Sequence, residues 1–207
     1  MKNQEIIEQD RLNAFKAGLK ENQGHFAQCL GRDYKAVPTL FEALEKLYLY
    51  AVEKQRINAS SFVNYVPPKK EALQDMRSFQ EKDGLSAILV SGDSGTGKTT
   101  WLKKIVQDSW DNFKPGKPIP VFIHLISVPK NRLEEELLNY IFKEQLIESR
   151  LISALKLYGN FVFFLDGFDE VAYQGSLYLS NKFANWGRVK IVTACRPEAI
   201  PAQMLTE

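Results

Sequence analysis

The chain has 207 residues, of which 44% are hydrophobic and 25% charged, and its formal net charge is +2. This is the composition of a globular protein with one sizeable core, which excludes a disordered chain. The small net charge gives no reason to expect a nucleic acid or an anionic membrane as a partner.

The sequence shows no pattern of a signal peptide, a membrane span or a cysteine metal site. The first residues, MKNQEIIEQD, lack the apolar core of a signal peptide, and no stretch approaches 18 consecutive apolar residues. The two cysteines, Cys29 and Cys195, lie far apart and match no metal-ligand spacing. We therefore expect a cytoplasmic protein with reduced thiols.

Residues 1–60 show no strand pattern and are expected to form a small all-helical region. One helix is predicted in IIEQDRLNAFKAGLK and another in PTLFEALEKLYLYAVEK, where the apolar residues fall on one face and Pro38 suits the first turn. Residues 61–84 form a connector that contains Pro67, Pro68 and a short helical stretch, EALQDMRSF.

From residue 85 to 207, apolar strands alternate with amphipathic helices. The predicted strands, all of them buried, are SAILVSG, PIPVFIHLISV, FVFFLD and VKIVTA. The predicted helices are TTWLKKIVQDSW, a segment that Asn131 can cap, and SRLISALKLY, which Gly159 closes. This alternation predicts an α/β fold, a three-layer sandwich with a mostly parallel sheet.

A glycine-rich motif follows the first strand. Residues 92–99 read GDSGTGKT, which matches the phosphate-binding pattern G-x-x-x-x-G-K-[ST]. Such a loop points its backbone N–H groups at phosphate oxygens, and the following helix adds its positive N-terminal end. The motif predicts a nucleotide site built by the following residues: Gly92, Ser94, Gly95, Thr96, Gly97, Lys98, Thr99 and Thr100.

Three acids follow the third strand. Asp166 ends the apolar run FVFFLD, and Asp169 and Glu170 come just after it. Magnesium prefers oxygen ligands and keeps several waters, so one carboxylate together with the Thr99 hydroxyl suffices to hold it. We assign that role to Asp166, and expect Asp169 or Glu170 to orient or deprotonate an attacking water. The alternative interpretation is three acids that solvate a surface loop.

Arg196 follows the fourth strand, in VKIVTACRPE. The carboxyl ends of parallel strands share one edge of a sheet, so this arginine is placed near the phosphate loop. It either contacts the γ-phosphate or is a surface residue before Pro197. His25 and His124 have no ligand partners near them in the sequence and are interpreted as structural.

Together, GDSGTGKTT, FFLDGFDE and IVTACRPE resemble the NACHT branch of the STAND signalling NTPases, over about residues 85–200. The pattern D-G-hydrophobic-D-E is the specific part of this resemblance. PIPVFIHLISV is similar to the second strand of NACHT domains, and T-x-C-R-P to their first sensor. Tyr65-Val66-Pro67 is similar to the segment that packs against the adenine base.

This resemblance implies an ATP- or ADP-binding switch with Mg²⁺ and slow hydrolysis. Lys98 and Thr99 then hold phosphate and magnesium, Asp166 is the magnesium acid, and Arg196 is the sensor. The implied partner is another protein or a further copy of the chain. NACHT proteins usually continue into helical, winged-helix and repeat domains, and a fifth strand is expected, so we interpret the chain as an incomplete domain.

Three other classes of P-loop protein can be weighed. A GTPase would read guanine with N-K-x-D, and the nearest match, at residues 181–184, is NKFA, which lacks the acid. An AAA-type ATPase that couples steady ATP turnover to mechanical work shares the same sheet and stays open as the alternative. A helicase-like or recombinase-like ATPase is disfavoured because no basic stripe is evident.

Overall fold

The computed structural model describes residues 2–30, 34–54, 68–69, 72, 76, 78–79, 87–128, 149–171, 177–183 and 188–199. The strands are β1 (Ala87–Ser91), β2 (Ile119–His124), β3 (Asn160–Asp166) and β4 (Arg188–Cys195). The α-helices are α1 (Lys2–Glu21), α2 (Gln23–Cys29), α3 (Val37–Leu49), α5 (Lys98–Asp111), α7 (Ser149–Tyr158) and α8 (Leu177–Ser180). A π-helical turn, η2 (Tyr50–Lys54), continues α3, and single 3-10 turns lie at η1 (Tyr34–Ala36), η4 (Leu125–Ser127), η6 (Phe168–Glu170) and η8 (Pro197–Ala199).

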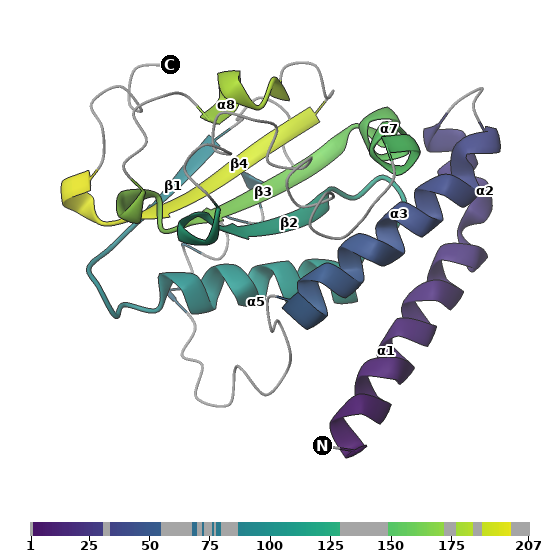
Figure 1. The fold of residues 1–207 in the computed structure, drawn as a ribbon, viewed down its shortest axis with the longest axis horizontal. Coiled ribbons are helices and arrows are strands. Elements are labelled where there is room, and N and C mark those ends of the chain that lie inside the picture. Colours follow the sequence, from purple (N-terminus) through teal and green to yellow (C-terminus); the bar gives the residue numbers. More distant parts are fainter. Residues whose placement is uncertain are drawn as a thin grey trace.

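The four strands form one parallel sheet in the order β1-β4-β3-β2 (Figure 1). β4 therefore lies between the strand that precedes the glycine-rich loop and the strand that ends in Asp166. All four strands run in the same direction, so their carboxyl ends meet at one edge. The predicted parallel α/β fold is confirmed.

Both faces of the sheet are covered, as the side chains of β3 show. Phe163 stacks on Phe183 with ring centroids 4.7 Å apart, whereas Val162 and Phe164 line a cavity beside α5. Successive strand residues point to opposite faces, so the segment after α8 covers one face and α5 covers the other. Six of the seven residues of β3 are buried, which explains its continuous apolar run.

Two strand predictions need correction. The exposed or half-buried residues of β1 show that this strand is not buried on both faces, because within the described residues it pairs only with β4. The predicted second strand, residues 118–128, is a strand only from Ile119 to His124 and then turns into η4. Leu125 and Val128 are buried in this turn, which accounts for the longer apolar pattern.

The helix predictions agree closely with the structure. α7 spans the predicted segment, and Gly159 adopts φ 64° where it donates its N–H to the Leu155 carbonyl at 3.0 Å. α3 begins at Val37 with Pro38 in its first turn and buries its apolar face. The segment with Asn131, and most of residues 61–84, lie outside the described residues.

The N-terminal helices pack on the carboxyl end of α5. Phe15 of α1 stacks on Tyr48 of α3 with centroids 4.5 Å apart, and both rings meet Trp110 edge-on at 5.7 and 5.9 Å. Arg11 binds the Asp111 carboxylate with two bonds, of 2.6 and 2.7 Å. The region before the connector is thus attached to the helix that begins at the glycine-rich loop. Among the helices of the described residues, none is long and apolar enough to cross a membrane.

Candidate functional site

The glycine-rich loop connects β1 to α5 and needs two glycines for its shape. Gly95 has φ 78° and Gly97 has φ 86°, values in the left-handed region that other L-residues adopt at a cost. Gly97 is also the N-cap of α5, the residue directly before the helix begins at Lys98. A Cβ at Gly92 would lie 3.1 Å from Thr96 Oγ1, so the loop is also closely packed at its start.

Lys98, the first residue of α5, turns its ammonium back onto this loop. Its Nζ donates to the Gly92 carbonyl at 2.5 Å and to the Asp93 carbonyl at 2.9 Å. Thr96 Oγ1 donates to the same Asp93 carbonyl at 2.8 Å. The loop is therefore held by its own side chains, and a phosphate would compete with the two carbonyls for the Lys98 charge.

Thr99 and Asp166 join the loop to the end of β3. The Thr99 hydroxyl donates to Asp166 Oδ2 at 2.8 Å, although the two residues are 67 positions apart in the chain. Asp166 is only 3% exposed, which makes it the only charged residue that is buried among the described residues. The hydroxyl and the carboxylate place two hard oxygen donors side by side at the start of α5.

Asp169 and Arg196 close another side of the same region. Arg196 Nε lies 3.0 Å from Asp169 Oδ2, and the acid is 9% exposed while the arginine is 50% exposed. Asp169 belongs to the turn η6, which begins after Gly167 with φ 74°. A Cβ at Gly167 would lie 3.6 Å from Glu170 Cδ, so Glu170 folds back over that glycine.

His124 also lies here, which the sequence interpretation missed. It ends β2, and its Nε2 is 3.8 Å from Asp166 Oδ2. The parallel register pairs His124 with Asp166 directly. The position of a histidine at the end of a predicted parallel strand was the available signal, because such ends gather at one edge of the sheet.

These groups surround a cavity of about 290 Å³. The residues lining it are Ser94, Gly95, Gly97, Lys98, Thr99, Thr100, Asp166, Gly167, Asp169, Glu170, Ala194 and Arg196. The N-terminus of α5 opens into it, and the free N–H groups of that first turn favour an anion. The structure thus brings together at one cavity nearly all the residues proposed from the sequence. Gly92 and Thr96 belong to the same loop but do not line the cavity, and Val66 and Pro67 lie outside the described residues.

The charges at this cavity favour a nucleotide that arrives together with a cation. Lys98 and Arg196 face three carboxylates, so the lining itself carries a formal excess of one negative charge. A polyphosphate would meet that excess unless a divalent ion entered with it. Thr99 and Asp166 supply the hard oxygen ligands that magnesium prefers, and magnesium needs few protein ligands because it keeps its waters. Among the described residues, no group of three or more His, Cys, Asp or Glu side chains is arranged so that it could hold a metal ion.

Cys195 lies beneath the site and is fully buried. Burial raises the pKa of its thiol, the Asp169 carboxylate raises it further, and the Lys98 ammonium partly offsets the shift. The thiol therefore stays protonated at neutral pH and is a poor nucleophile.

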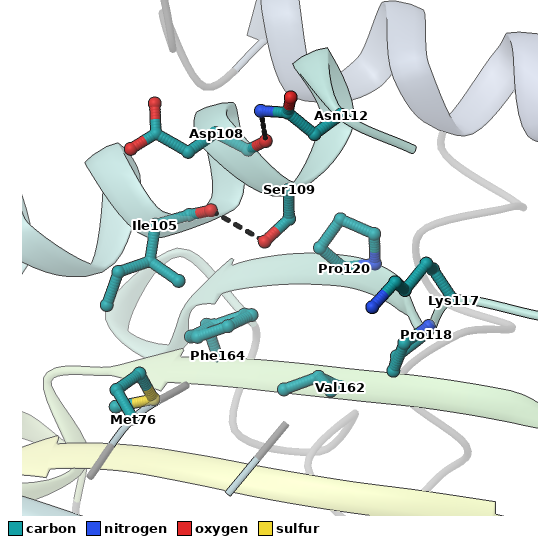
Figure 2. Close-up of a pocket in the computed structure, with 10 residues that line it drawn as sticks. All are labelled: Met76, Ile105, Asp108, Ser109, Asn112, Lys117, Pro118, Pro120, Val162 and Phe164. Carbon is teal, nitrogen blue, oxygen red and sulfur yellow. Dashed lines mark hydrogen bonds between the residues drawn. The ribbon is translucent and has the colours of Figure 1, made fainter. Parts of the chain in front are cut away.

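A second cavity, of about 300 Å³, lies between α5 and the sheet, toward the carboxyl end of that helix (Figure 2). Two of its polar side chains bind backbone carbonyls: Ser109 Oγ donates to Ile105 and Asn112 Nδ2 to Asp108. Val162 and Phe164 form its floor on the sheet. The carboxyl end of a helix repels anions, so this cavity is unsuited to phosphate.

Comparison with known families supports the same assignment. A model of the NACHT domain matches residues 86–206, which is more than half of the chain and includes the glycine-rich loop, the three acids and Arg196. No curated protein and no solved structure matches the chain. With a parallel sheet, a phosphate-binding loop at the start of α5 and this family match, the chain belongs to the NACHT family of nucleotide-binding P-loop NTPases.

Proposed function

We propose that the chain binds ATP or ADP with Mg²⁺ and acts as the nucleotide switch of a STAND-type signalling NTPase, with slow hydrolysis. The observation that carries the proposal is the 2.8 Å hydrogen bond between Thr99 and Asp166. It joins the start of α5, where phosphate binds, to the buried acid at the end of β3. A P-loop and an acid in this relation are the two halves of a magnesium–phosphate site.

The roles we propose follow from what each group can do. The loop amides at residues 94–100 and Lys98 bind phosphate oxygens, which requires the ammonium to leave the carbonyls of Gly92 and Asp93. Thr99 and Asp166 hold the magnesium ion, which supplies charge neutralisation when bound. Glu170 or Asp169 orients a water toward the γ-phosphate, and Arg196 contacts that phosphate.

Adenine rather than guanine is the proposed base. Reading guanine takes an N-K-x-D carboxylate, and the sequence NKFA at residues 181–184 has none. Asn181 is also fully buried in the segment after α8, where it cannot face a base. We propose Val66 and Pro67 as the residues that pack on adenine.

The charges at the site fit the slow ATP turnover of a switch better than the steady ATP turnover of a mechanical ATPase. Lys98 is occupied by loop carbonyls and Arg196 by Asp169, so neither cation is free for a transferring phosphoryl group in this arrangement. A switch needs the nucleotide to persist, and its output is assembly with a protein partner or with further copies of the chain. We place this function in the cytoplasm.

The test is nucleotide binding by the wild-type chain and by Lys98→Ala, measured by calorimetry with magnesium. Loss of one charge-assisted phosphate contact should weaken ADP and ATP binding by roughly a hundredfold. Lys104→Ala is the matched control, because Lys104 lies on the same helix and pairs with Asp108 instead. GDP and GTP should bind more weakly than their adenine counterparts.

Equal affinities of Lys98→Ala and the wild type would refute the nucleotide site. Brisk multiple-turnover hydrolysis would instead favour the alternative, an AAA-type ATPase that performs mechanical work.

A further inference from the structure

His124 lies where two strands end side by side. β2 and β3 pair in parallel with His124 opposite Asp166, so the two side chains project to the same face of the sheet. The Asp166 side chain is 4% exposed and the His124 side chain 44% exposed. A histidine with this exposure at the end of a strand contributes little to the core. We therefore look to its polar contacts for its role.

The imidazole is oriented with one nitrogen toward the acids. Its Nδ1 lies 3.5 Å from Ser127 Oγ in the turn η4, and its Nε2 lies 3.8 Å from Asp166 Oδ2. If the Ser127 hydroxyl donates to Nδ1, Nε2 carries the proton and presents a donor to the carboxylate. The same Asp166 oxygen accepts the Thr99 hydroxyl at 2.8 Å, so Thr99 and His124 both address this carboxylate.

Gly167 lies next to both His124 and Glu170. A Cβ on Gly167 would lie 3.7 Å from His124 Nε2 and 3.7 Å from Glu170 Oε2. The imidazole and the Glu170 carboxylate therefore border the same small space beside the glycine. A donor there can stabilise two neighbouring carboxylates, which otherwise repel each other.

We propose that His124 is a positioning residue of the magnesium–nucleotide site: its Nε2 lies 3.8 Å from Asp166 Oδ2, beyond hydrogen-bond length, and by closing on that carboxylate as a donor it keeps the acid turned toward Thr99. This inference rests on the proposed function and adds a residue to it. His124 does not line the 290 Å³ cavity, so it acts on the nucleotide only through Asp166. Groups that orient a metal-binding side chain commonly change metal affinity by tenfold or more.

The test separates the magnesium-dependent part of binding from the rest. ADP affinity of the full chain is measured by calorimetry in magnesium and again in EDTA, for the wild type, His124→Leu and His124→Gln. His124→Leu should lower affinity in magnesium by roughly tenfold and leave affinity in EDTA unchanged. His124→Gln, whose amide N–H reaches about as far as Nε2, should restore most of the loss.

His25→Leu is the matched control, because His25 is the only other histidine and is exposed on α2. It should bind like the wild type in both buffers, and all variants should melt at the wild-type temperature. The inference is overturned if His124→Leu matches the wild type in magnesium, if it loses affinity equally in both buffers, or if His124→Gln is as weak as His124→Leu. A wild-type chain that binds ADP while Lys98→Ala does not supports the proposed function independently. Those three outcomes would therefore overturn only the role of His124, whereas a wild-type chain without magnesium-dependent binding overturns both.

Discussion

Arg196 Nε lies 3.0 Å from Asp169 Oδ2, so the arginine proposed to sense the γ-phosphate is paired with an acid in this structure. The acid is nearly buried and the arginine half-exposed, which means that the arginine is the partner that can move. A γ-phosphate would compete with Asp169 for the guanidinium. On the proposed function, the pair would link the presence of that phosphate to the conformation of the turn η6.

Replacing Arg196 should therefore distinguish ATP from ADP. In Arg196→Ala we expect ATP affinity to fall roughly tenfold, because one charged contact is lost, while ADP affinity changes less than twofold. Arg188→Ala, at the opposite end of β4, is the matched control and should leave both affinities unchanged. Calorimetry with each nucleotide gives the answer, and an equal loss for ATP and ADP would exclude a γ-phosphate contact.

The three acids should separate by role. Asp166→Ala removes a carboxylate that is bonded to Thr99, so magnesium-dependent ADP binding should weaken about tenfold or more. Glu170→Ala and Asp169→Ala should spare ADP binding in magnesium and lower hydrolysis. Affinity is read by calorimetry and hydrolysis by phosphate release. If all three variants lost affinity alike, the assignment of roles would be wrong, and if none had any effect, the acids would only solvate a loop.

Turnover by the wild-type chain should be slow, well below the median enzyme value of about 10 per second. The reason is electrostatic, since two cations face three carboxylates at the cavity and phosphoryl transfer needs positive charge from several sides. Steady-state phosphate release with saturating ATP and magnesium measures it, with Lys98→Ala as the blank. A rate near or above that median would contradict the switch.

Because of the partly buried phenol of Tyr158, we expect the folded chain to lose stability in alkali. Its hydroxyl accepts the Gly116 N–H at 2.8 Å and donates to the Lys117 carbonyl at 3.0 Å, which holds the turn before β2. Burial raises the pKa of this phenol above its ordinary value of 10.0, and the hydrogen bond from Gly116 offsets this in part. The raised pKa means that the contribution to stability is complete below pH 10.0 and is lost as the pH rises above it.

Tyr158→Phe should cost about 1 kcal/mol at neutral pH through the lost hydrogen bonds. It should also decline less steeply than the wild type above pH 10.0. Denaturant unfolding at several pH values measures the free energy of unfolding of both chains. The difference between the two removes the contribution of the other tyrosines, because both chains contain them. Parallel profiles above pH 10.0 would show that the Tyr158 phenol is not stabilised in its neutral form.

The parts of the site that depend on local pattern were predictable from the sequence. Lys98 and Thr99 follow an apolar strand and open an amphipathic helix, and Asp166 ends a continuous apolar run, so each residue's neighbours fix its place in the fold. The same local rules gave α7 and its closure at Gly159.

What depends on contacts between distant segments was not predictable. The position of β4 between β1 and β3 follows from strand pairing, which no periodicity in the sequence encodes. The meeting of Arg196 with Asp169, and of His124 with Asp166, depends on that order and on register. His124 was read as structural because its partner lies 42 positions away in the sequence and next to it only in the sheet.

Helix α5 has a consequence that reaches beyond the cavity. Its 14 residues span about 21 Å, with Lys98 and Thr99 at one end and Asp111, held by Arg11 of α1, at the other. The phosphate loop and the N-terminal helices therefore contact opposite ends of the same helix. Consider a protein that binds α1 and changes the affinity of the chain for nucleotide by some factor. By thermodynamic linkage, nucleotide must then change the affinity of the chain for that protein by the same factor. Binding of a protein to the N-terminal helices and binding of a nucleotide to the loop would then both act on α5, from its two ends.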